Sequence, residues 1–116
     1  ANARSLFAAH LGDKLAGTVQ LITAMPQNQP HRAEIAKMMV HPTARRRGLG
    51  RALLSAALDH ARALGKTHVT LDTRSGDVSQ SLYASVGFEV AGVIPDFALD
   101  PDGRTLHSTT YMFKRL

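Results

Sequence analysis

The first part of the chain alternates between short apolar runs and polar connections, a pattern that predicts β-strands joined by turns. Three strand-length apolar runs precede Pro42, at residues 6–9, 15–24 and 33–40. Gly12-Asp13 separates the first two runs and favours a two-residue hairpin turn, so these strands are expected to be antiparallel. Residues 25–31 are polar, contain two prolines and predict an exposed loop. The third strand should end at Pro42.

Helical periodicity begins at Gly50, where apolar residues start to recur at intervals of three and four. The stripe consists of Leu53, Leu54, Ala57, Leu58, Ala61 and Leu64. Gly65 follows it directly, at the position where a left-handed residue commonly ends a helix. The sequence therefore predicts one amphipathic helix between Gly50 and Gly65.

A second, shorter helix is predicted after a turn at residues 75–77. The side chain of Asp77 can cap its N-terminus, and the side chain of Gln80, three residues later, can hydrogen-bond back to the amide of Asp77. The helix carries Tyr83 and should stop at Gly87. Further strands are expected at residues 68–71, 88–94 and 108–113, with a turn at 101–103. This order of elements predicts an α/β (α+β) fold, in which helices pack against a mixed sheet.

The composition limits the class of protein. At 116 residues the chain has the length of a single domain, residues 1–116, and with 44% hydrophobic residues it should form a core. Cysteine is absent, which excludes disulfides, thiolate metal sites and cysteine nucleophiles. No apolar stretch reaches the roughly 20 residues of a membrane span, and no two histidines stand at metal-ligand spacing. We expect a cytoplasmic protein that holds no metal.

Positive charge is concentrated in one segment of a chain whose formal net charge is +5. Residues 45–50 read Arg-Arg-Arg-Gly-Leu-Gly, are followed by Arg51, and lie between the third strand and the first helix. The amides and dipole of a helix N-terminus favour anions, and glycine lets a backbone approach a phosphate. The dinucleotide-binding motif does not match, because it needs Gly or Ala at the position of Leu53. The nucleoside-triphosphate loop does not match either, because it needs Gly at the position of His60. A solvated basic turn explains the segment equally well.

The basic segment and its flanks resemble the GNAT superfamily of N-acetyltransferases. The acetyl-CoA loop of that family has Arg or Gln, two residues, Gly, one residue, and Gly or Ala, which Arg45, Gly48 and Gly50 match. Residues 38–42 (Met-Met-Val-His-Pro) look like its fourth strand, and residues 81–88 (Ser-Leu-Tyr-Ala-Ser-Val-Gly-Phe) look like its second signature. The resemblance implies a mixed, mostly antiparallel sheet flanked by helices.

Two features of the sequence refine this resemblance, and two depart from it. Residues 32–34 and 101–104 look like the tabtoxin-resistance acetyltransferase and its relatives. The family usually begins with a strand and two helices that form one wall of the acceptor site, which this sequence lacks, and the chain begins at Ala1 without an initiator Met. We therefore expect an N-terminally incomplete domain. Many members also carry, at the position of Gly76, an Asn that contacts the cofactor.

The resemblance implies that acetyl-CoA is the co-substrate. The loop backbone would hold its pyrophosphate, and backbone groups of the third predicted strand would bind pantetheine and polarise the thioester carbonyl. The expected contacts are Met38, Met39, Val40, Arg45, Arg46, Arg47, Gly48, Leu49, Gly50, Arg51 and Ser79. The side chains of residues 38–40 are expected in the core.

The resemblance also assigns catalytic roles. Tyr83 matches the usual general acid, which protonates the leaving CoA thiolate. An ammonium acceptor must lose a proton before it attacks, and Glu34 and Asp72 match the bases of a histone-acetylating and a ribosomal-protein-acetylating branch. Glu34 lies in an apolar strand, where burial would raise its pKa. An ordinary salt bridge or hydrogen bond explains either carboxylate equally well, and packing alone can explain Tyr83.

We expect direct transfer of acetyl to a primary amine of a small molecule, such as an amino-acid-like antibiotic or toxin. A protein N-terminus, a lysine side chain or a polyamine stays open, as does a non-catalytic module that binds CoA, another phosphate or RNA. The few aromatic residues argue against a nucleic acid partner, and no membrane partner is expected. Phe97, His107 and Tyr111 can line the acceptor site or simply pack. The family often dimerises through its late strands, so a homodimer is expected by resemblance.

Overall fold

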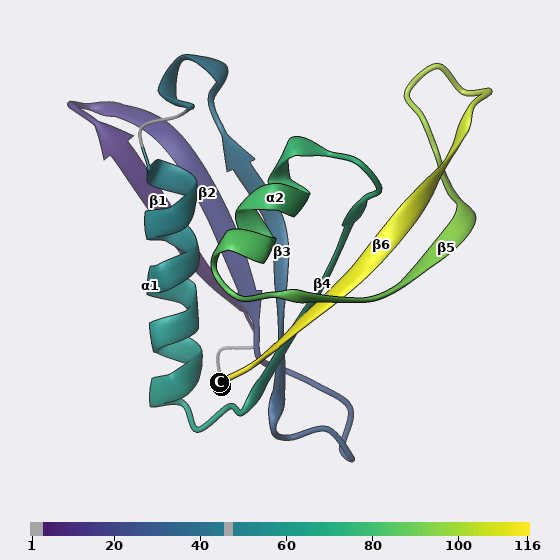
Figure 1. Cartoon of the computed structure of the whole chain (residues 1–116). Helices are drawn as coiled ribbons and strands as arrows, with labels where there is room; N and C mark the ends of the chain where they lie inside the picture. The colour runs from purple at the N-terminus through teal and green to yellow at the C-terminus, as the bar shows by residue number, and fades with distance from the viewer. Residues whose placement is uncertain (1–3, 46–47) are drawn as a thin grey trace. The chain divides into compact units, whose positions relative to one another are not determined.

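The computed structural model describes residues 4–45 and 48–116. Its internal contacts form two compact units, Ala1–Val69 with Arg115–Leu116, and Thr70–Lys114. Along the chain the elements are β1 (Arg4–Leu11), β2 (Lys14–Ile22), β3 (Arg32–Val40), the short 3₁₀ helix η1 (Pro42–Ala44), α1 (Leu49–Ala63), β4 (His68–Arg74), α2 (Val78–Ser85), β5 (Glu89–Leu99) and β6 (Leu106–Arg115) (Figure 1). Apart from η1, this is the order that the sequence predicts.

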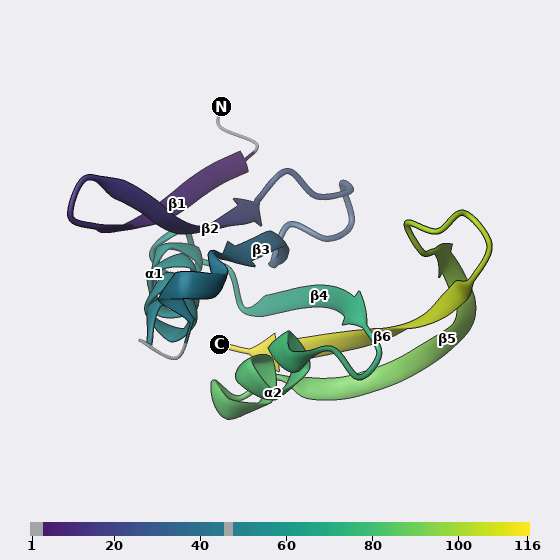
Figure 2. The ribbon, with the colours of Figure 1, turned by 90° about the horizontal axis from the view of Figure 1, so that it is seen from above.

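The first unit is an antiparallel sheet in the order β1-β2-β3, with α1 packed on one of its faces (Figure 2). Leu11 pairs with Lys14, so Gly12-Asp13 forms the predicted two-residue turn. Gly12 has a φ of 65°, and primed hairpin turns require a positive φ at their first central position. Helix α1 buries the predicted apolar stripe except for Leu64, which is 52% exposed because the helix has already ended at Ala63.

A β-bulge interrupts the pairing of β2 with β3. Thr18 pairs with Met39 and Gln20 pairs with Ala36, so β3 has one residue more than β2 between these pairs. Lys37, inside the bulge, has a φ of 52°, which non-glycine residues rarely adopt. The bulge therefore changes the direction of the last residues of β3, those that the sequence analysis assigned to the cofactor.

Gly17 allows the backbones of β2 and β3 to lie close together beside this bulge. A Cβ at Gly17 would lie 2.9 Å from the carbonyl oxygen of Met39 and 3.1 Å from Cδ1 of Leu53. Gly17→Ala is expected to lower the free energy of unfolding by about 1 to 3 kcal/mol, since the backbone must shift to accept the methyl group. Urea unfolding measures this effect. Gly92→Ala in β5 is the matched control, because a Cβ there meets nothing within 4 Å, and an equal loss in both variants would contradict the prediction.

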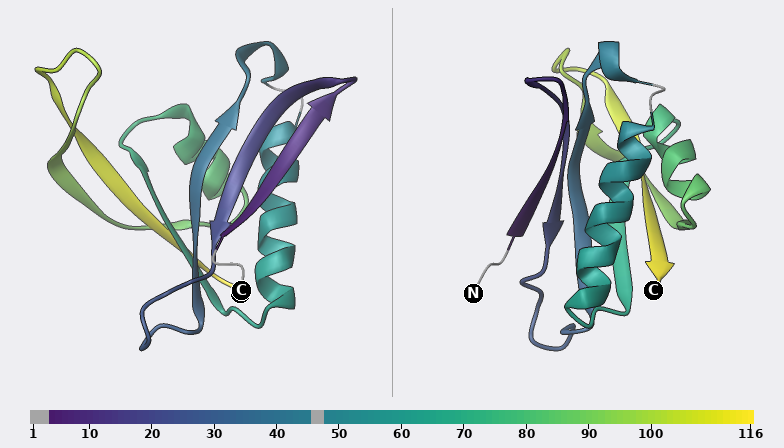
Figure 3. Two further views of the ribbon diagram at one scale, coloured as in Figure 1. Left: turned by 180° about the vertical axis from the view of Figure 1, so that it is seen from behind. Right: turned by 90° about the vertical axis from the view of Figure 1, so that its left-hand side faces the viewer.

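The second unit contains strands in the order β4-β6-β5, with α2 on one face (Figure 2). β5 and β6 form a long twisted antiparallel pair (Figure 3). β5 extends beyond the predicted end at residue 94, because Ala98 pairs again with His107 after a bulge that contains Pro95 and Asp96. Proline has no N–H to donate to the neighbouring strand, but a bulge tolerates it. The sequence-based prediction ends the strand at residue 94, just before this proline.

The turn between β5 and β6 lies where the sequence predicts it. The carboxylate of Asp102 accepts hydrogen bonds from the amides of Arg104 (2.8 Å) and Thr105 (2.9 Å) and from the hydroxyl of Thr105 (2.6 Å). The side-chain bond from Thr105, then the two backbone bonds, lower the pKa of Asp102 to about 2. An aspartate that satisfies its own turn in this way explains why residues 101–103 can be assigned from sequence.

Helix α2 ends at Gly87 as predicted, in a Schellman motif. The amide of Gly87, with a φ of 102°, donates to the carbonyl of Ala84 (3.0 Å), and the amide of Phe88 donates to that of Tyr83 (3.0 Å). The rings of Tyr83 and Phe88 meet edge to face at 6.0 Å, the apolar contact that accompanies this motif. The spacing of Tyr, Gly and Phe in residues 81–88 is therefore the spacing of a helix cap.

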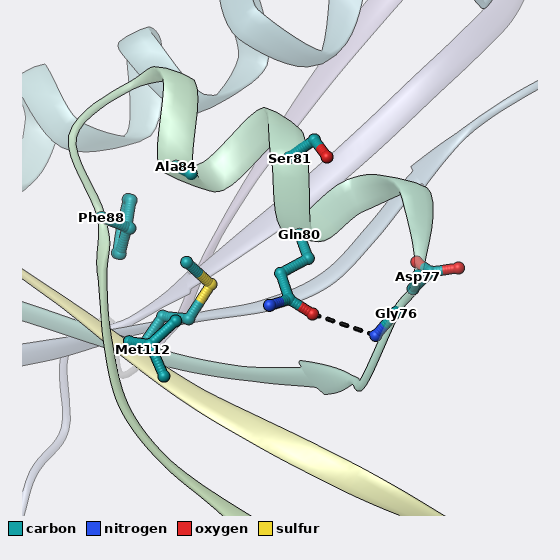
Figure 4. Close-up of a pocket in the computed structure, with 8 residues that line it drawn as sticks. Gly76, Asp77, Gln80, Ser81, Ala84, Phe88 and Met112 are labelled. Atoms are coloured by element: carbon teal, nitrogen blue, oxygen red, sulfur yellow. Dashed lines mark hydrogen bonds between the residues drawn. The ribbon is translucent and has the colours of Figure 1, made fainter.

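The N-terminus of α2 differs from the expected capping pair. Asp77 occupies the N-cap position, but its side chain makes no capping hydrogen bond and instead accepts the hydroxyl of Ser79. Gln80 does reach back, yet its Oε1 accepts the amide of Gly76 at 3.0 Å instead of that of Asp77 (Figure 4). The predicted cap is thus wrong for Asp77, because a nearer hydroxyl competes for the carboxylate.

Candidate functional site

The N-terminus of α1 is built to accept an anion. Gly48 is the N-cap, with a φ of 76°, and the space that its Cβ would fill is empty to 4 Å. The helix begins when the amide of Ala52 donates to the carbonyl of Gly48 (3.0 Å), so the amides before Ala52 have no acceptor within the helix. The N-cap, Gly48, has no side chain that could cap them, and the first turn holds no acidic residue. Such a helix end fits a phosphate group.

Arginines flank this helix end. Arg45 is exposed in extended conformation just before it, and Arg51 is exposed in its first turn. Arg46 and Arg47, which the sequence analysis also assigned to the cofactor, lie outside the described residues. Within the described part of the loop, the donors and positive charges match the pyrophosphate of CoA in chemistry.

The end of β3 corrects the expected burial of residues 38–40. Met38 and Val40 are half-buried, and the side chain of Met39 is 67% exposed. Ala33 and Ile35 are buried, yet Met39, an even number of residues further on, faces solvent because the bulge at Lys37 resets the alternation of faces. The expected core position of Met39 is therefore wrong, whereas the role proposed for its backbone does not depend on its side chain.

Tyr83 is buried in the second unit, with 5% of its surface exposed. Burial raises its pKa to about 12, and the negative charge of Asp77 adds to this increase. A hydrogen bond with Ser79 acts in the opposite direction, and the charge of Asp72 contributes a smaller increase. The phenol of Tyr83 is therefore protonated throughout the physiological pH range, the state that a general acid needs.

A small group of polar side chains surrounds the Tyr83 phenol. Ser79, one turn before Tyr83 on α2, also contacts the hydroxyl of Thr73 on β4 at 3.1 Å and the carboxylate of Asp77. The sequence predicts Ser79 as a cofactor contact, but it does not predict that Asp77 and Thr73 contact Ser79 beside Tyr83. The spacing of four residues between Ser79 and Tyr83 on one helix was a usable signal. Nothing in the sequence indicated Thr73, since only the folded chain brings β4 to α2.

The raised pKa of Tyr83 has a consequence for stability. Because the folded state binds the phenol proton more tightly than the unfolded state, the stabilisation is complete below pH 10 and is lost as the pH rises through 12. We expect a fall of roughly 2 to 3 kcal/mol in the free energy of unfolding across this window that is absent in Tyr83→Phe. Urea unfolding at pH 9 to 12 measures it. Parallel curves for the two proteins would show that the phenol is not held neutral.

Glu34 is not the buried carboxylate that the sequence suggested. Its side chain is 41% exposed, and Oε1 accepts a hydrogen bond from Nη1 of Arg32 at 2.7 Å. Arg32 is in turn bound by Gln29 at 2.7 Å. The carboxylate of Glu34 is therefore not desolvated as predicted, and it is already paired with the guanidinium group of Arg32. Glu34 therefore forms a salt bridge, one of the alternatives that the sequence left open.

Asp72 has a different environment. It is exposed near the end of β4, and its Oδ2 accepts a hydrogen bond from the buried Thr109 at 3.3 Å. Among residues 4–45 and 48–116, no lysine, arginine or histidine lies within ion-pair distance of its carboxylate. Asp72 is therefore the candidate carboxylate that can still receive a proton or pair with an ammonium group.

The three residues proposed to line an acceptor site fall into two clusters. Phe97 and Tyr111 form an aromatic pair, with ring centroids 6.1 Å apart and planes at 89°. His107 instead hydrogen bonds to Asp100 (2.8 Å), which also binds Arg74 through both carboxylate oxygens. His107 is thus part of a polar cluster at the end of the hairpin, and the aromatic pair remains open to a ligand.

A groove of about 390 Å³ also lies in the second unit, beside α2. Phe88 and Met112 line its apolar part, and Asp77, Gln80 and Ser81 line its polar part (Figure 4). Tyr83 does not line it. Among the described residues, no three histidine, aspartate or glutamate side chains come together as metal ligands would, and no helix is long and apolar enough to cross a membrane.

Comparison with known proteins decides the family. The model of the acetyltransferase (GNAT) family matches residues 1–88, which include the loop before α1, the end of β3 and Tyr83. The chain belongs to this family. The resemblance stated from sequence is thereby confirmed at the level of the family, whose members include acetyltransferases that use acetyl-CoA.

Relatives and solved structures agree with this assignment. The chain is 31% identical over 94 residues to an uncharacterized N-acetyltransferase, YvbK, of Bacillus subtilis, and the match covers 80% of this chain and 58% of YvbK. It superposes on the structure of yncA, a putative acetyltransferase from Salmonella typhimurium with its cofactor acetyl-CoA, with a TM-score of 0.85 and 26% identity. This match covers 96% of this chain and 64% of yncA. It also superposes on the structure of a GNAT-family acetyltransferase from Streptococcus pneumoniae with a TM-score of 0.88 and 22% identity. This match covers 98% of this chain and 68% of that structure. The GNAT fold class is confirmed, and the chain spans little more than half of YvbK.

Proposed function

We propose that this GNAT chain transfers an acetyl group directly from acetyl-CoA to a primary amine of a small molecule. The observation that carries the proposal is the N-terminus of α1, whose N-cap Gly48 has no side chain and whose first turn has no acidic residue, and which presents amides and arginines to an anion where the family holds CoA. The match to the GNAT family and to an acetyltransferase structure with acetyl-CoA supports it. RNA binding is disfavoured, because the positive charge of the described loop is focused on one helix end.

Binding of acetyl-CoA would use backbone more than side chains. The amides of Gly48, Leu49 and Gly50 would donate to the pyrophosphate, with Arg45 and Arg51 adding charge, and Arg46 and Arg47 are proposed by sequence alone. The backbone of Met38, Met39 and Val40 would bind pantetheine and polarise the thioester carbonyl. Gly17 and the bulge at Lys37 hold this backbone in place.

In the transfer step the neutral amine nitrogen would attack the thioester carbon, and the new C–N bond would form as the C–S bond breaks. The thiolate of CoA would take a hydrogen bond, and finally a proton, from the Tyr83 phenol, and the proton that the attacking nitrogen loses as the amide forms would restore the phenol. Ser79 would orient this phenol through its hydrogen bond. The proton released by the ammonium form of the acceptor would pass to a carboxylate or to water.

Between the two candidate bases, the contacts favour Asp72. Glu34 is already bound by the guanidinium of Arg32, whereas Asp72 is bound by a neutral hydroxyl. Asp72→Asn is expected to lower kcat/KM for the amine about 100-fold, and Glu34→Gln to leave it close to the wild-type value. Steady-state rates at saturating acetyl-CoA measure both values. Wild-type values in both variants would identify water, or ionisation of the substrate itself, as the route for the proton.

The test of the proposal is a calorimetric titration of the purified protein with acetyl-CoA, followed by an assay of CoA thiol release with a panel of amines. Micromolar binding together with amine-dependent release supports the acetyltransferase. Binding without release for any small amine, peptide N-terminus or lysine peptide would leave a CoA-binding module. Absence of binding by a folded protein would overturn the proposal altogether.

A further inference from the structure

The sheet of the second unit has one face that α2 does not cover. Thr73 faces α2, because its hydroxyl contacts Ser79, and Met112 lines the groove beside α2. Side chains alternate between the two faces of a strand, so Asp72 and Tyr111, their sequence neighbours, lie on the opposite face. The bond from Thr109, two residues before Tyr111, to Asp72 confirms this placement. This open face therefore combines a carboxylate with an aromatic ring.

The aromatic part of the open face is a corner between two rings. Phe97 and Tyr111 are perpendicular to each other and are 45% and 37% exposed. Gly92 is the cross-strand partner of Tyr111, and a side chain built there would meet nothing within 4 Å. An apolar group can thus contact both rings without displacing another side chain.

The charges on this face are arranged to favour a cation near Asp72. Arg74 lies on the same face, but Asp100 neutralises it through two hydrogen bonds and also binds His107. Asp72 keeps a hydroxyl as its partner, so its negative charge remains available to a ligand. A carboxylate of this kind, next to an aromatic surface, complements an ammonium group that carries an apolar substituent.

We infer that the acceptor is a primary ammonium compound with an aromatic or branched apolar group, bound with its nitrogen at Asp72 and its apolar group between Phe97 and Tyr111. This inference rests on the proposed acetyltransferase function and names its substrate class. Thr109 and Tyr111 are two residues apart on β6, which places the two subsites about 7 Å apart along the strand. A chain of about three or four carbons between nitrogen and ring spans that distance, whereas the single carbon of benzylamine does not.

The test uses a series of phenylalkylamines, from benzylamine to 4-phenylbutylamine, with butylamine as the apolar control. We expect kcat/KM to rise at least tenfold from benzylamine to 3-phenylpropylamine or 4-phenylbutylamine. Tyr111→Ala and Phe97→Ala should each remove most of that rise. Val78→Ala on α2, an exposed residue outside both sites, is the matched control and should leave the series unchanged. Equal kcat/KM values for butylamine and all phenylalkylamines would overturn the inference while leaving the acetyltransferase intact.

A second readout is independent of turnover. Binding of 3-phenylpropylamine to the CoA-loaded protein, followed by NMR of the ligand, should weaken at least fivefold in Asp72→Asn, and 3-phenylpropanol, which lacks the charge, should bind no better to wild type than to the variant. Ammonium binding that is unaffected by Asp72→Asn would overturn the inference. Sedimentation provides the remaining check: if Tyr111→Ala converts a dimer into a monomer, a second copy of the chain covers this face and the acceptor does not bind there.

Discussion

Replacement of Tyr83 by phenylalanine is expected to lower kcat about 100-fold with little change in the KM for acetyl-CoA. In the ground state the phenol is hydrogen-bonded to the neutral side chain of Ser79, and a hydrogen bond from the phenol to CoA gains strength only when negative charge develops on the departing sulfur. Since its pKa is about 12, Tyr83 stays protonated across the usable pH range. Wild-type kcat should therefore show no falling limb from this residue between pH 7 and pH 10.5, as steady-state rates with a saturating amine would reveal.

Ser85→Ala is the matched control for Tyr83→Phe. It also removes one hydroxyl from α2, yet Ser85 lies at the exposed end of the helix, where its Oγ bonds the carbonyl of Leu82 (2.7 Å). We expect this control to keep wild-type kcat. If Tyr83→Phe also turned over at the wild-type rate, the buried phenol would have only a packing role with Phe88, and another group would protonate the thiolate.

Gly48→Glu is expected to weaken acetyl-CoA binding at least 100-fold, about 2.7 kcal/mol. The new carboxylate would stand at the N-cap of α1, where it can accept the helix amides that the pyrophosphate is proposed to use, and it would repel the phosphates. Gly48 also holds a φ of 76°, so any other residue adds backbone strain of about 1 to 2 kcal/mol to the folded state. Isothermal titration with acetyl-CoA measures the affinity.

Gly65→Glu separates the loss of the site from the backbone strain. Gly65 has a φ of 80°, meets nothing within 4 Å at its Cβ position, and lies at the other end of the same helix. Both variants should therefore lose stability to a similar degree, whereas only Gly48→Glu should lose affinity. Equal affinity for acetyl-CoA in Gly48→Glu and wild type would place the cofactor elsewhere.

Local chemistry in the sequence determined most of the secondary structure. Gly12 and Gly65 could be assigned because few residues other than glycine adopt a positive φ, and the turn at residues 101–103 because Asp102 bonds to its own neighbours. Tyr83, Gly87 and Phe88 form a helix cap, which is a local motif with fixed spacing. Where local rules compete, the predictions were wrong. The side chain of Asp77 does not cap α2, and β5 continues past Pro95 because β6 pairs with it again.

The sequence by itself thus determined the family, the order of strands and helices, and the loop that begins α1. Only the tertiary structure decided the environment of each titratable or exposed group: the salt bridge that occupies Glu34, the solvent exposure of Met39 beyond a bulge, and the raised pKa of Tyr83. It also decided the face shared by Asp72 and Tyr111. The reason is physical, since burial, charge and contact depend on residues distant in the chain, whereas turns and caps depend on residues a few positions apart.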